Sequence, residues 1–314
     1  MKTPEEFREF YDRELLPDIA ELENQRKSVL SRIPLIIVPL ALATACALLI
    51  IPGDGKFFAL FAGIAVMAIA FAVLTKKFVN DFKERVIGKI VLFFDKGFKY
   101  RKEDRIPLSY FNESNIFLKR PDEYSGEDRI TGILGVTQID FSELKAQTVT
   151  KDSKGRKHYH TFFKGLFFIA DFNKDFHSST YVLPDTAEKL FGGLGSFMQK
   201  RNISRPELVK LENPEFEKLF VVYSGDQIEA RYILSTSLMS RIVEYRKKTG
   251  RKISISFKNS KMFVAIPYNK NILEPNIFKT LLDFDTIQTY FDDLNMVMSI
   301  VDDLNLNTRI WSKR

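Results

Sequence analysis

The chain has 314 residues, and its 47 Lys and Arg against 40 Asp and Glu give a formal charge of +7. This excess is mild for the length, so charge does not favour a nucleic-acid partner, and none is expected. One cysteine and three histidines exclude an internal disulfide framework and leave little material for a zinc site.

Residues 1–32 are predicted to form a cytoplasmic amphipathic helix that bends near Pro17. The segment contains six basic and eight acidic residues. Its apolar stripe consists of Phe7, Phe10, Tyr11, Leu15, Leu16, Ile19 and Leu22. An amphipathic helix must bury such a stripe, and net negative charge disfavours an anionic membrane surface. We therefore expect the helix to dock on the cytoplasmic part of its own chain or of a neighbouring copy.

Two uncharged runs, 33–51 and 57–74, predict a transmembrane helical hairpin over residues 33–74. As a helix each run is about 27–29 Å long, close to the ~30 Å hydrocarbon core of a bilayer. A signal peptide is disfavoured because 32 residues precede the first run and a second run follows at once. Two buried helices of a soluble protein are the remaining alternative. Small residues spaced by four on the second run allow close helix approach, either within the hairpin or in a homo-oligomer.

Basic residues flank the hairpin on the sides that lead to the two termini. They are Arg26, Lys27 and Arg32 before it and Lys76, Lys77, Lys83 and Arg85 after it. Lys and Arg are retained on the cytoplasmic side, so both termini are expected there. The chain is thus predicted to be a multi-pass protein of the cell inner membrane, with the lipid bilayer as its first partner.

The remaining chain predicts an α+β fold of antiparallel strands and helices on the cytoplasmic side. The expected parts are a helical stalk over 75–96, a β-rich subdomain over 97–201 and an α+β subdomain over 202–314. Strands are predicted within 128–133, 136–149, 158–172, 179–183 and 220–223, and a β-hairpin over 253–266 turns at Asn259-Ser260. Helices are predicted over 185–201, 226–245 and 285–304.

No catalytic, cofactor-binding or metal-binding residues are predicted. His158 and His160 lie on one face of a predicted strand, but a third and a fourth ligand are not evident. The glycines of 192–195 lack the Gly-Lys-Ser/Thr ending of a phosphate-binding loop. No nucleophile elbow is present, so the sequence does not predict an enzyme and leaves the question open.

Two basic clusters are candidates for contact with anionic lipid, which attracts each nearby Lys or Arg by about 1 kcal/mol. They consist of Lys151, Lys154, Arg156 and Lys157 in a hairpin tip, and Arg246, Lys247 and Lys248 at a helix end. Solvated chain ends of no further role are the alternative interpretation.

Three motifs resemble a bacterial membrane-protein family, domain of unknown function 3137. They are Gly165-Leu-Phe-Phe-Ile-Ala-Asp-Phe-Asn-Lys174, Leu211-Glu-Asn-Pro-Glu-Phe-Glu-Lys-Leu-Phe220 and Asp226-Gln-Ile-Glu-Ala-Arg-Tyr-Ile-Leu234. The resemblance implies a two-pass protein of the bacterial inner membrane and assigns no catalytic residues. It also implies association with LemA-type membrane proteins.

The function predicted from these features is that of a membrane-anchored cytoplasmic scaffold or protein-interaction module. The alternative is a lipid- or ligand-sensing domain, for which a pleckstrin-homology-like barrel over 97–183 would be suited. An unrecognised enzyme is the third hypothesis.

Overall fold

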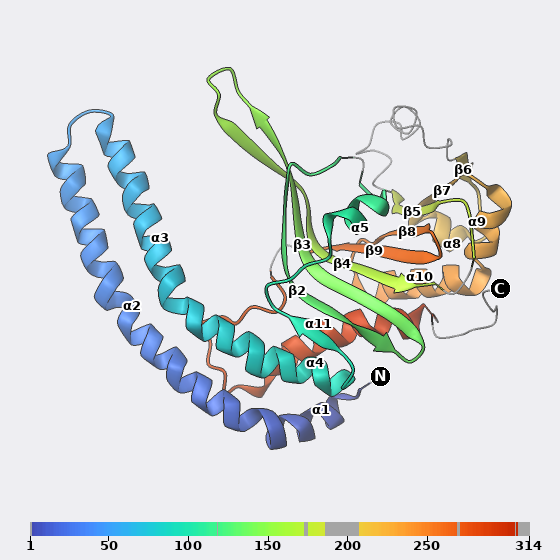
Figure 1. Cartoon of the computed structure of the whole chain (residues 1–314), viewed down its shortest axis with the longest axis horizontal. Helices are drawn as coiled ribbons and strands as arrows, with labels where there is room; N and C mark the ends of the chain where they lie inside the picture. The colour runs from blue at the N-terminus through green and yellow to red at the C-terminus, as the bar shows by residue number, and fades with distance from the viewer. Residues whose placement is uncertain are drawn as a thin grey trace. The chain divides into compact units, whose positions relative to one another are not determined.

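The computed structural model describes residues 2–117, 119–172, 175–185, 207–268, 271–304 and 306. The chain divides into two compact units. The stem unit comprises Lys2–Phe93 and Leu273–Asp293, and the sheet unit comprises Phe94–Ile272 and Leu294–Arg314 with Met1. Figure 1 follows both along the chain by colour.

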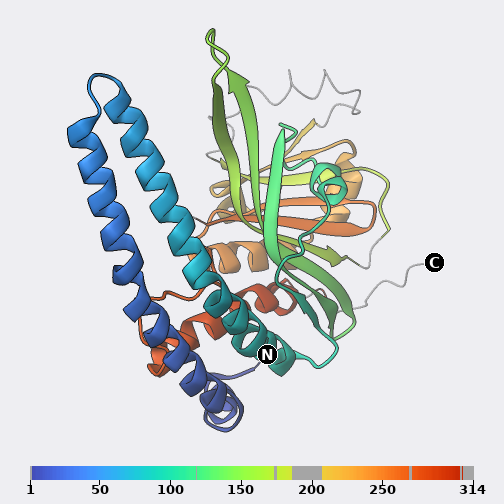
Figure 2. The same cartoon turned by 60° about the vertical axis from the view of Figure 1, so that its left-hand side comes forward.

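The stem unit consists mainly of two long helices that run antiparallel side by side (Figures 1 and 2). In chain order its helices are α1 (Pro4–Phe10), the π-helical turn η1 (Tyr11–Leu15), α2 (Leu16–Ile50), α3 (Gly55–Phe82), the π-helical turn η2 (Lys83–Ile87) and α4 (Gly88–Phe94). The two predicted spans are therefore helical. The N-terminal helix continues through η1 into the first span, and the second span continues through η2 into the predicted stalk.

Two π-helical turns interrupt the α-helical hydrogen-bond pattern of the stem. In η1 the N–H of Leu16 donates to the carbonyl of Tyr11, and in η2 the N–H of Gly88 donates to that of Lys83. A π turn accommodates one additional residue in the helix. The bend predicted near Pro17 takes this form, because η1 ends two residues before a proline that has no N–H to donate.

The N-terminal helix begins with a reciprocal cap. The N–H of Glu6 donates to Oγ1 of Thr3 at 3.2 Å, and the N–H of Thr3 donates to Glu6 at 2.8 Å. The stripe beyond it is buried within the stem unit. The Phe7 ring stacks on Phe291 at 4.3 Å and the Phe10 ring on Phe93 at 4.4 Å. The expected docking on the same chain is thus observed.

Leu16 was expected in this stripe, and that expectation was wrong. Its side chain is 39% exposed, whereas Leu15 and Ile19 are fully buried. Adjacent residues of a helix point about 100° apart, so Leu16 lies off the face that Leu15 occupies.

The helices α2 and α3 pack closely at Gly63. A Cβ added there would overlap the side chain of Thr44 on α2. The small residue at this position therefore serves packing inside the hairpin.

The sheet unit is built on one antiparallel sheet of nine strands. Its order is β1-β2-β3-β4-β9-β8-β5-β7-β6. The strands are β1 (Lys99–Arg101), β2 (Glu123–Leu134), β3 (Thr137–Lys151), β4 (Lys157–Asp171), β5 (Thr180–Pro184), β6 (Glu207–Val209), β7 (Phe220–Ser224), β8 (Ser254–Lys258) and β9 (Lys261–Pro267). The predicted α+β fold class is confirmed.

Five helices complete the described structure. They are α5 (Leu108–Glu113), α8 (Pro214–Glu217), α9 (Gln227–Ile233), α10 (Thr236–Thr249) and α11 (Phe284–Asp303). The side chains of Asp226 and Ser235 cap α9 and α10, and Gly250 ends α10 in the left-handed conformation at φ 65°. Residues up to Asp293 of α11 belong to the stem unit and the rest to the sheet unit.

The predicted hairpin of β8 and β9 is confirmed together with its turn. Asn259 and Ser260 both have positive φ, 52° and 56°, as a two-residue type I′ turn requires. The resulting hairpin inserts between β4 and β5, because β4 pairs with β9 and β5 pairs with β8. Residues 97–183 therefore do not close into a barrel, so the pleckstrin-homology-like barrel of the alternative hypothesis was wrong.

The helix predicted over 185–201 and the glycines of 192–195 lie outside the described residues, apart from Asp185. The boundary predicted near residue 201 lies there too and stays a prediction. Described strands from both sides of it belong to the one sheet.

Candidate functional site

A cavity of about 330 Å³ opens on the sheet unit where β2, β3 and β4 run side by side. Its lining comprises Ser125, Gly126, Glu127, Glu143, Leu144, Lys145, Lys164, Gly165 and Asn271. This volume is at the lower end of the range for small-molecule sites, about 300–1,000 Å³. Most of those lining side chains are polar or charged, which suits a small ionic ligand better than an apolar one.

Two lysines face each other at this cavity. Lys145 and Lys164 are direct cross-strand partners on β3 and β4, and Ser125 on β2 completes their row. Both lysines are half-buried, and within the described part of the chain neither forms an ion pair. Like charges directly opposite one another destabilise a sheet. An anion between them would relieve that repulsion.

Two glutamates occupy the next row of the same face. Glu127 and Glu143 are cross-strand partners on β2 and β3. The Glu143 carboxylate accepts from the Ile272 N–H at 2.7 Å, and Glu127 accepts from the Asn271 amide at 3.2 Å. These carboxylates thereby fix the segment after β9 against the sheet and form one wall of the cavity.

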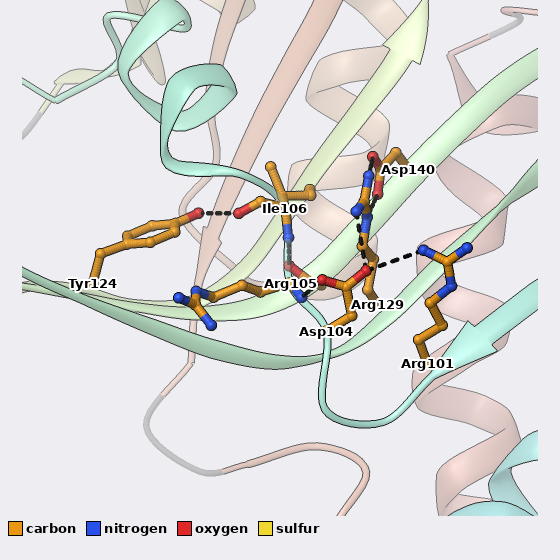
Figure 3. Close-up of polar contacts among 8 residues, drawn as sticks. Arg101, Asp104, Arg105, Ile106, Tyr124, Arg129 and Asp140 are labelled. Carbon is orange, nitrogen blue, oxygen red and sulfur yellow. Dashed lines mark hydrogen bonds and ion pairs between the residues drawn. The ribbon is translucent and has the colours of Figure 1, made fainter.

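The opposite face of the same strands is crossed by residues 102–106. Figure 3 shows Arg129 between two carboxylates, bonded bidentately to Asp140 at 3.0 and 2.8 Å and to Asp104 at 3.1 Å. The N–H of Ile106 donates to Ser142 at 3.0 Å, and its carbonyl accepts from the Tyr124 hydroxyl at 2.7 Å. These bonds fasten the crossing segment, and we assign them a structural role.

Charge and burial act in opposite directions on this network. Burial raises the pKa of Asp104, but the Arg105 N–H and the guanidinium of Arg129 outweigh it, so the pKa lies below its usual value. Hydrogen bonding to Asp140 raises the pKa of Arg129 further. Asp104 and Arg129 therefore carry opposite charges at neutral pH.

The first predicted basic cluster lies at the end of a protruding ribbon. Beyond Gln147, β3 pairs only with β4 among the described strands, and both faces of this distal part are largely exposed (Figures 1 and 2). Lys151, Lys154, Arg156 and Lys157 lie around its turn. Arg156 bonds to Asp152 at 2.7 Å, and the three lysines form no ion pair within the described residues.

The second predicted cluster is more engaged. Lys247 forms an ion pair with Glu215, and Lys248 forms one with Asp303 at 3.2 Å. Arg246 accounts for the remaining charge at the end of α10, where basic residues favour the helix dipole. The structure thus places the two clusters on different elements, and most of the freely available charge is on the ribbon.

The three histidines lie in two different parts of the sheet unit. His158 and His160 are exposed on the distal part of β4, and His158 lies 3.4 Å from Asp152. The backbone N–H of His177 donates to Glu229 at 2.8 Å. Among the residues that the structure describes, no group of three or more His, Cys, Asp or Glu could hold a metal ion.

The stem unit contains a buried ion pair that the sequence analysis missed. Arg26 donates to both oxygens of Glu23 at 2.8 and 2.7 Å, and to the Ile277 carbonyl at 2.8 Å. Glu23 also accepts from the Leu281 N–H at 3.0 Å. We call these four residues the juxtamembrane clamp. The signal was a charged pair, three apart, on the buried face of a helix just before an apolar run.

Hydrogen bonds determine the titration of the clamp. The guanidinium of Arg26, together with the Leu281 N–H, lowers the pKa of Glu23 to about 2, although burial opposes the shift. Glu23 is 2% exposed. Removing either member of the pair would leave the other charge buried and uncompensated, which is strongly destabilising.

A second ionic contact joins the two long helices. Asp18 accepts from Arg85 at 2.6 Å and is also paired with Lys89, and Arg85 contacts Glu21 at 2.7 Å. Burial would raise the pKa of Asp18, but Lys89 and Arg85 lower it overall. The contact joins the start of α2 to η2 and α4.

Both long helices are apolar enough to cross a membrane. Each contains an 18-residue window with mean hydropathy of 2.6 or 2.7, and none of either window is buried in the protein. A core helix of a soluble protein would be covered by other protein atoms. Over the residues that the structure describes, the fold and these surfaces together define an α+β protein with two candidate membrane-spanning helices.

Residues 161–306 match the family described as protein of unknown function (DUF3137). The resemblance predicted from the three motifs is therefore confirmed over this region, which includes all of them. No curated protein matches the chain. Among solved structures, the crystal structure of the mycobacterial trehalose monomycolate transport factor A, TtfA, is similar, with 12% identity and a TM-score of 0.34 over 68% of this chain and 96% of that one.

Proposed function

We propose that this protein is a membrane-anchored interaction module of the bacterial inner membrane, with both termini in the cytoplasm. The observation that supports this best is that the apolar windows of α2 and α3 are not covered by other parts of the protein. Both helices continue beyond these windows into the part of the stem unit that packs against the N-terminal helix. Lys and Arg on both outer flanks of the hairpin favour cytoplasmic termini.

Reporter fusions test the orientation. A reporter after Arg314 is expected to be active only as a cytoplasmic reporter, and one inserted at Asp54 only as an external reporter. A C-terminal reporter that is active outside the cytoplasm would contradict the proposed topology.

The exposed ribbon is the element that we propose to contact anionic lipid. Its three lysines, which form no ion pair with any residue that the structure describes, surround a turn that extends beyond the neighbouring strands. Each such charge gains about 1 kcal/mol near an anionic surface, and salt screens the gain over about 10 Å at 0.1 M.

Lysine acetylation in nanodiscs can measure this contact on the full chain. Lys151, Lys154 and Lys157 are expected to be labelled more slowly in discs that contain phosphatidylglycerol than in discs of phosphatidylcholine, and 0.5 M salt should remove the difference. Lys210 is the matched control, since it is exposed on the same unit but lies outside the ribbon. Equal labelling in both lipids would contradict the contact.

An interaction module requires a partner, and we propose a membrane protein of the LemA type or a second copy of this chain. A photo-crosslinking residue in place of Tyr159, which is 48% exposed on the ribbon, would identify which one contacts the ribbon. Ile228, 82% exposed on α9, is the control position. A self-crosslink indicates a homo-oligomer, and the absence of any crosslink specific to position 159 would contradict a role for the ribbon in protein contact.

The opposed lysines favour a second function, the sensing of a small anion. Removal of one charge should stabilise the ligand-free protein, because Lys145 and Lys164 repel each other across the strands. We expect Lys164→Met to raise the apparent Tm without ligand and to abolish any rise caused by inorganic phosphate. If phosphate changes the Tm of neither protein at millimolar concentration, phosphate is not the ligand of this cavity.

A further inference from the structure

Residues 276–282 of the stem unit expose two large apolar side chains. Phe278 is 69% exposed and Leu282 is 50% exposed. Lys279 lies between them in the sequence. Exposed aromatic and aliphatic side chains next to a basic residue are typical of a segment that lies in a membrane interface.

The backbone of this segment is held in place. In the juxtamembrane clamp, Arg26 donates to the Ile277 carbonyl at 2.8 Å, and Glu23 accepts from the Leu281 N–H at 3.0 Å. Between these points, Asn276 accepts from the Phe278 N–H at 2.9 Å with its side chain and from the Lys279 N–H at 3.0 Å with its carbonyl. The backbone is therefore fastened on both sides of Phe278.

The position of Phe278 along the stem is given by its contact with α3. Its ring stacks on that of Phe71 at 6.3 Å with an angle of 16° between the planes. Phe71 lies three residues before Leu74, the end of the second uncharged run, which is about 4.5 Å inside that run. Phe278 therefore lies at the level where the membrane helix meets the headgroup region.

We propose that residues 276–282 form an interfacial membrane anchor, which inserts Phe278 and Leu282 into the boundary between headgroups and acyl chains. The ligand of this surface is the bilayer itself, because the same side chain touches a residue of the transmembrane run. The inference rests on the proposed membrane anchoring. It adds to the two proposed membrane-spanning helices a third contact with the bilayer, which is made by a segment far from the hairpin in sequence.

Tryptophan quenching by brominated lipid can test this in the full chain. Trp311, the one native tryptophan, is first replaced by Phe. Single tryptophans are then placed by Phe278→Trp and Leu282→Trp, with Phe61→Trp as the control inside the span. Leu92→Trp is the matched control outside it, since Leu92 is 47% exposed in the same unit but lies about 27 Å beyond the end of the run.

In nanodiscs with lipids brominated near the headgroup end of the acyl chains, we expect at least twofold quenching at positions 278 and 282 and little at 92. Equal quenching at positions 278 and 92 would overturn the anchor. Blue-shifted but unquenched emission at 278 would also overturn it, because the side chain would then be covered by protein. Loss of quenching at Phe61→Trp would instead refute the membrane anchoring itself. The two tryptophan positions in the segment guard against one variant that fails to fold.

Discussion

Replacing Glu23 by Gln tests how the segment after residue 272 is held on the stem. The change keeps the side-chain size but removes the charge that pairs with Arg26, and Arg26 would remain buried with one carbonyl partner. Loss of one member of a buried ion pair costs about 3–5 kcal/mol. An independent figure comes from the pKa of Glu23, about 2 in the fold against its ordinary value of 4.5. That difference corresponds to about 3 kcal/mol.

The sign of the pH dependence follows from the lowered pKa. The stabilisation is fully present above pH 4.5 and is lost as the pH falls from there towards 2, where Glu23 becomes protonated in the fold. In Glu23→Gln this part of the acid sensitivity should be absent.

Hydrogen exchange read by mass spectrometry on peptides that cover 273–283 provides the assay. A loss of about 3 kcal/mol makes local opening roughly a hundredfold more frequent, so these peptides should exchange about a hundredfold faster at neutral pH. Glu21→Gln is the matched control, because Glu21 is on the same helix and contacts Arg85 instead. If peptides from 273–283 exchange equally fast in Glu23→Gln and Glu21→Gln, the clamp does not hold this segment.

Three further predictions concern other contacts. Phe7→Ala removes a fully buried ring stacked on Phe291 and should lower the free energy of unfolding by about 3–5 kcal/mol, which limited proteolysis would show as faster cleavage within residues 1–25. The matched control Leu16→Ala changes an exposed side chain and should leave cleavage unchanged, and equal cleavage rates in the two variants would refute docking of the N-terminal helix. Gly63→Leu should lower the apparent Tm of the full chain in detergent by forcing α3 away from Thr44, whereas Ala62→Leu on the exposed side should not; a Tm unchanged in both would show that the two helices do not pack closely there. Arg129→Gln should reduce the hydrogen-exchange protection of residues 102–106 by about 1.5–3 kcal/mol. Arg101→Gln changes a side chain that is 61% exposed and should reduce it by less than about 1 kcal/mol, and the reverse order would contradict the role of Arg129 in fastening this segment.

Local sequence signals predicted the elements with strong periodicity or clear turn chemistry. The two apolar runs, the helix of residues 285–304 and the hairpin at Asn259-Ser260 all follow from patterns within a few turns of chain. In the structure the side chains of Asn213 and Asp226 cap α8 and α9, because each accepts from two of the next N–H groups.

Long-range pairing could not be predicted in the same way. Nothing in the sequence of β5 shows that β8, more than 70 residues later, is its neighbour, so the barrel that the alternative hypothesis placed over 97–183 was wrong. The cavity was missed for the same reason, because Lys145 and Lys164 meet only through strand register. The clamp depends on a contact between Arg26 and Ile277. The sequence shows that Glu23 and Arg26 lie three apart on one helix, but it does not show that Ile277 lies beside them.

The two π turns determine which way each helix faces on either side of them. The buried positions Phe78, Phe82, Val86 and Ile90 are spaced by four, so three turns contain 12 residues where an α-helix would hold about 11. Phe7, Tyr11, Leu15 and Ile19 have the same spacing around η1. The extra residue rotates one part of the helix by about 100° relative to the other, and this rotation sets which side chains the helix buries on either side of the turn. A single-residue deletion in Tyr11–Leu15 would therefore leave an unbroken α-helix, yet it would turn the entire N-terminal stripe away from its docking surface, a change in phase that no substitution at those positions could cause.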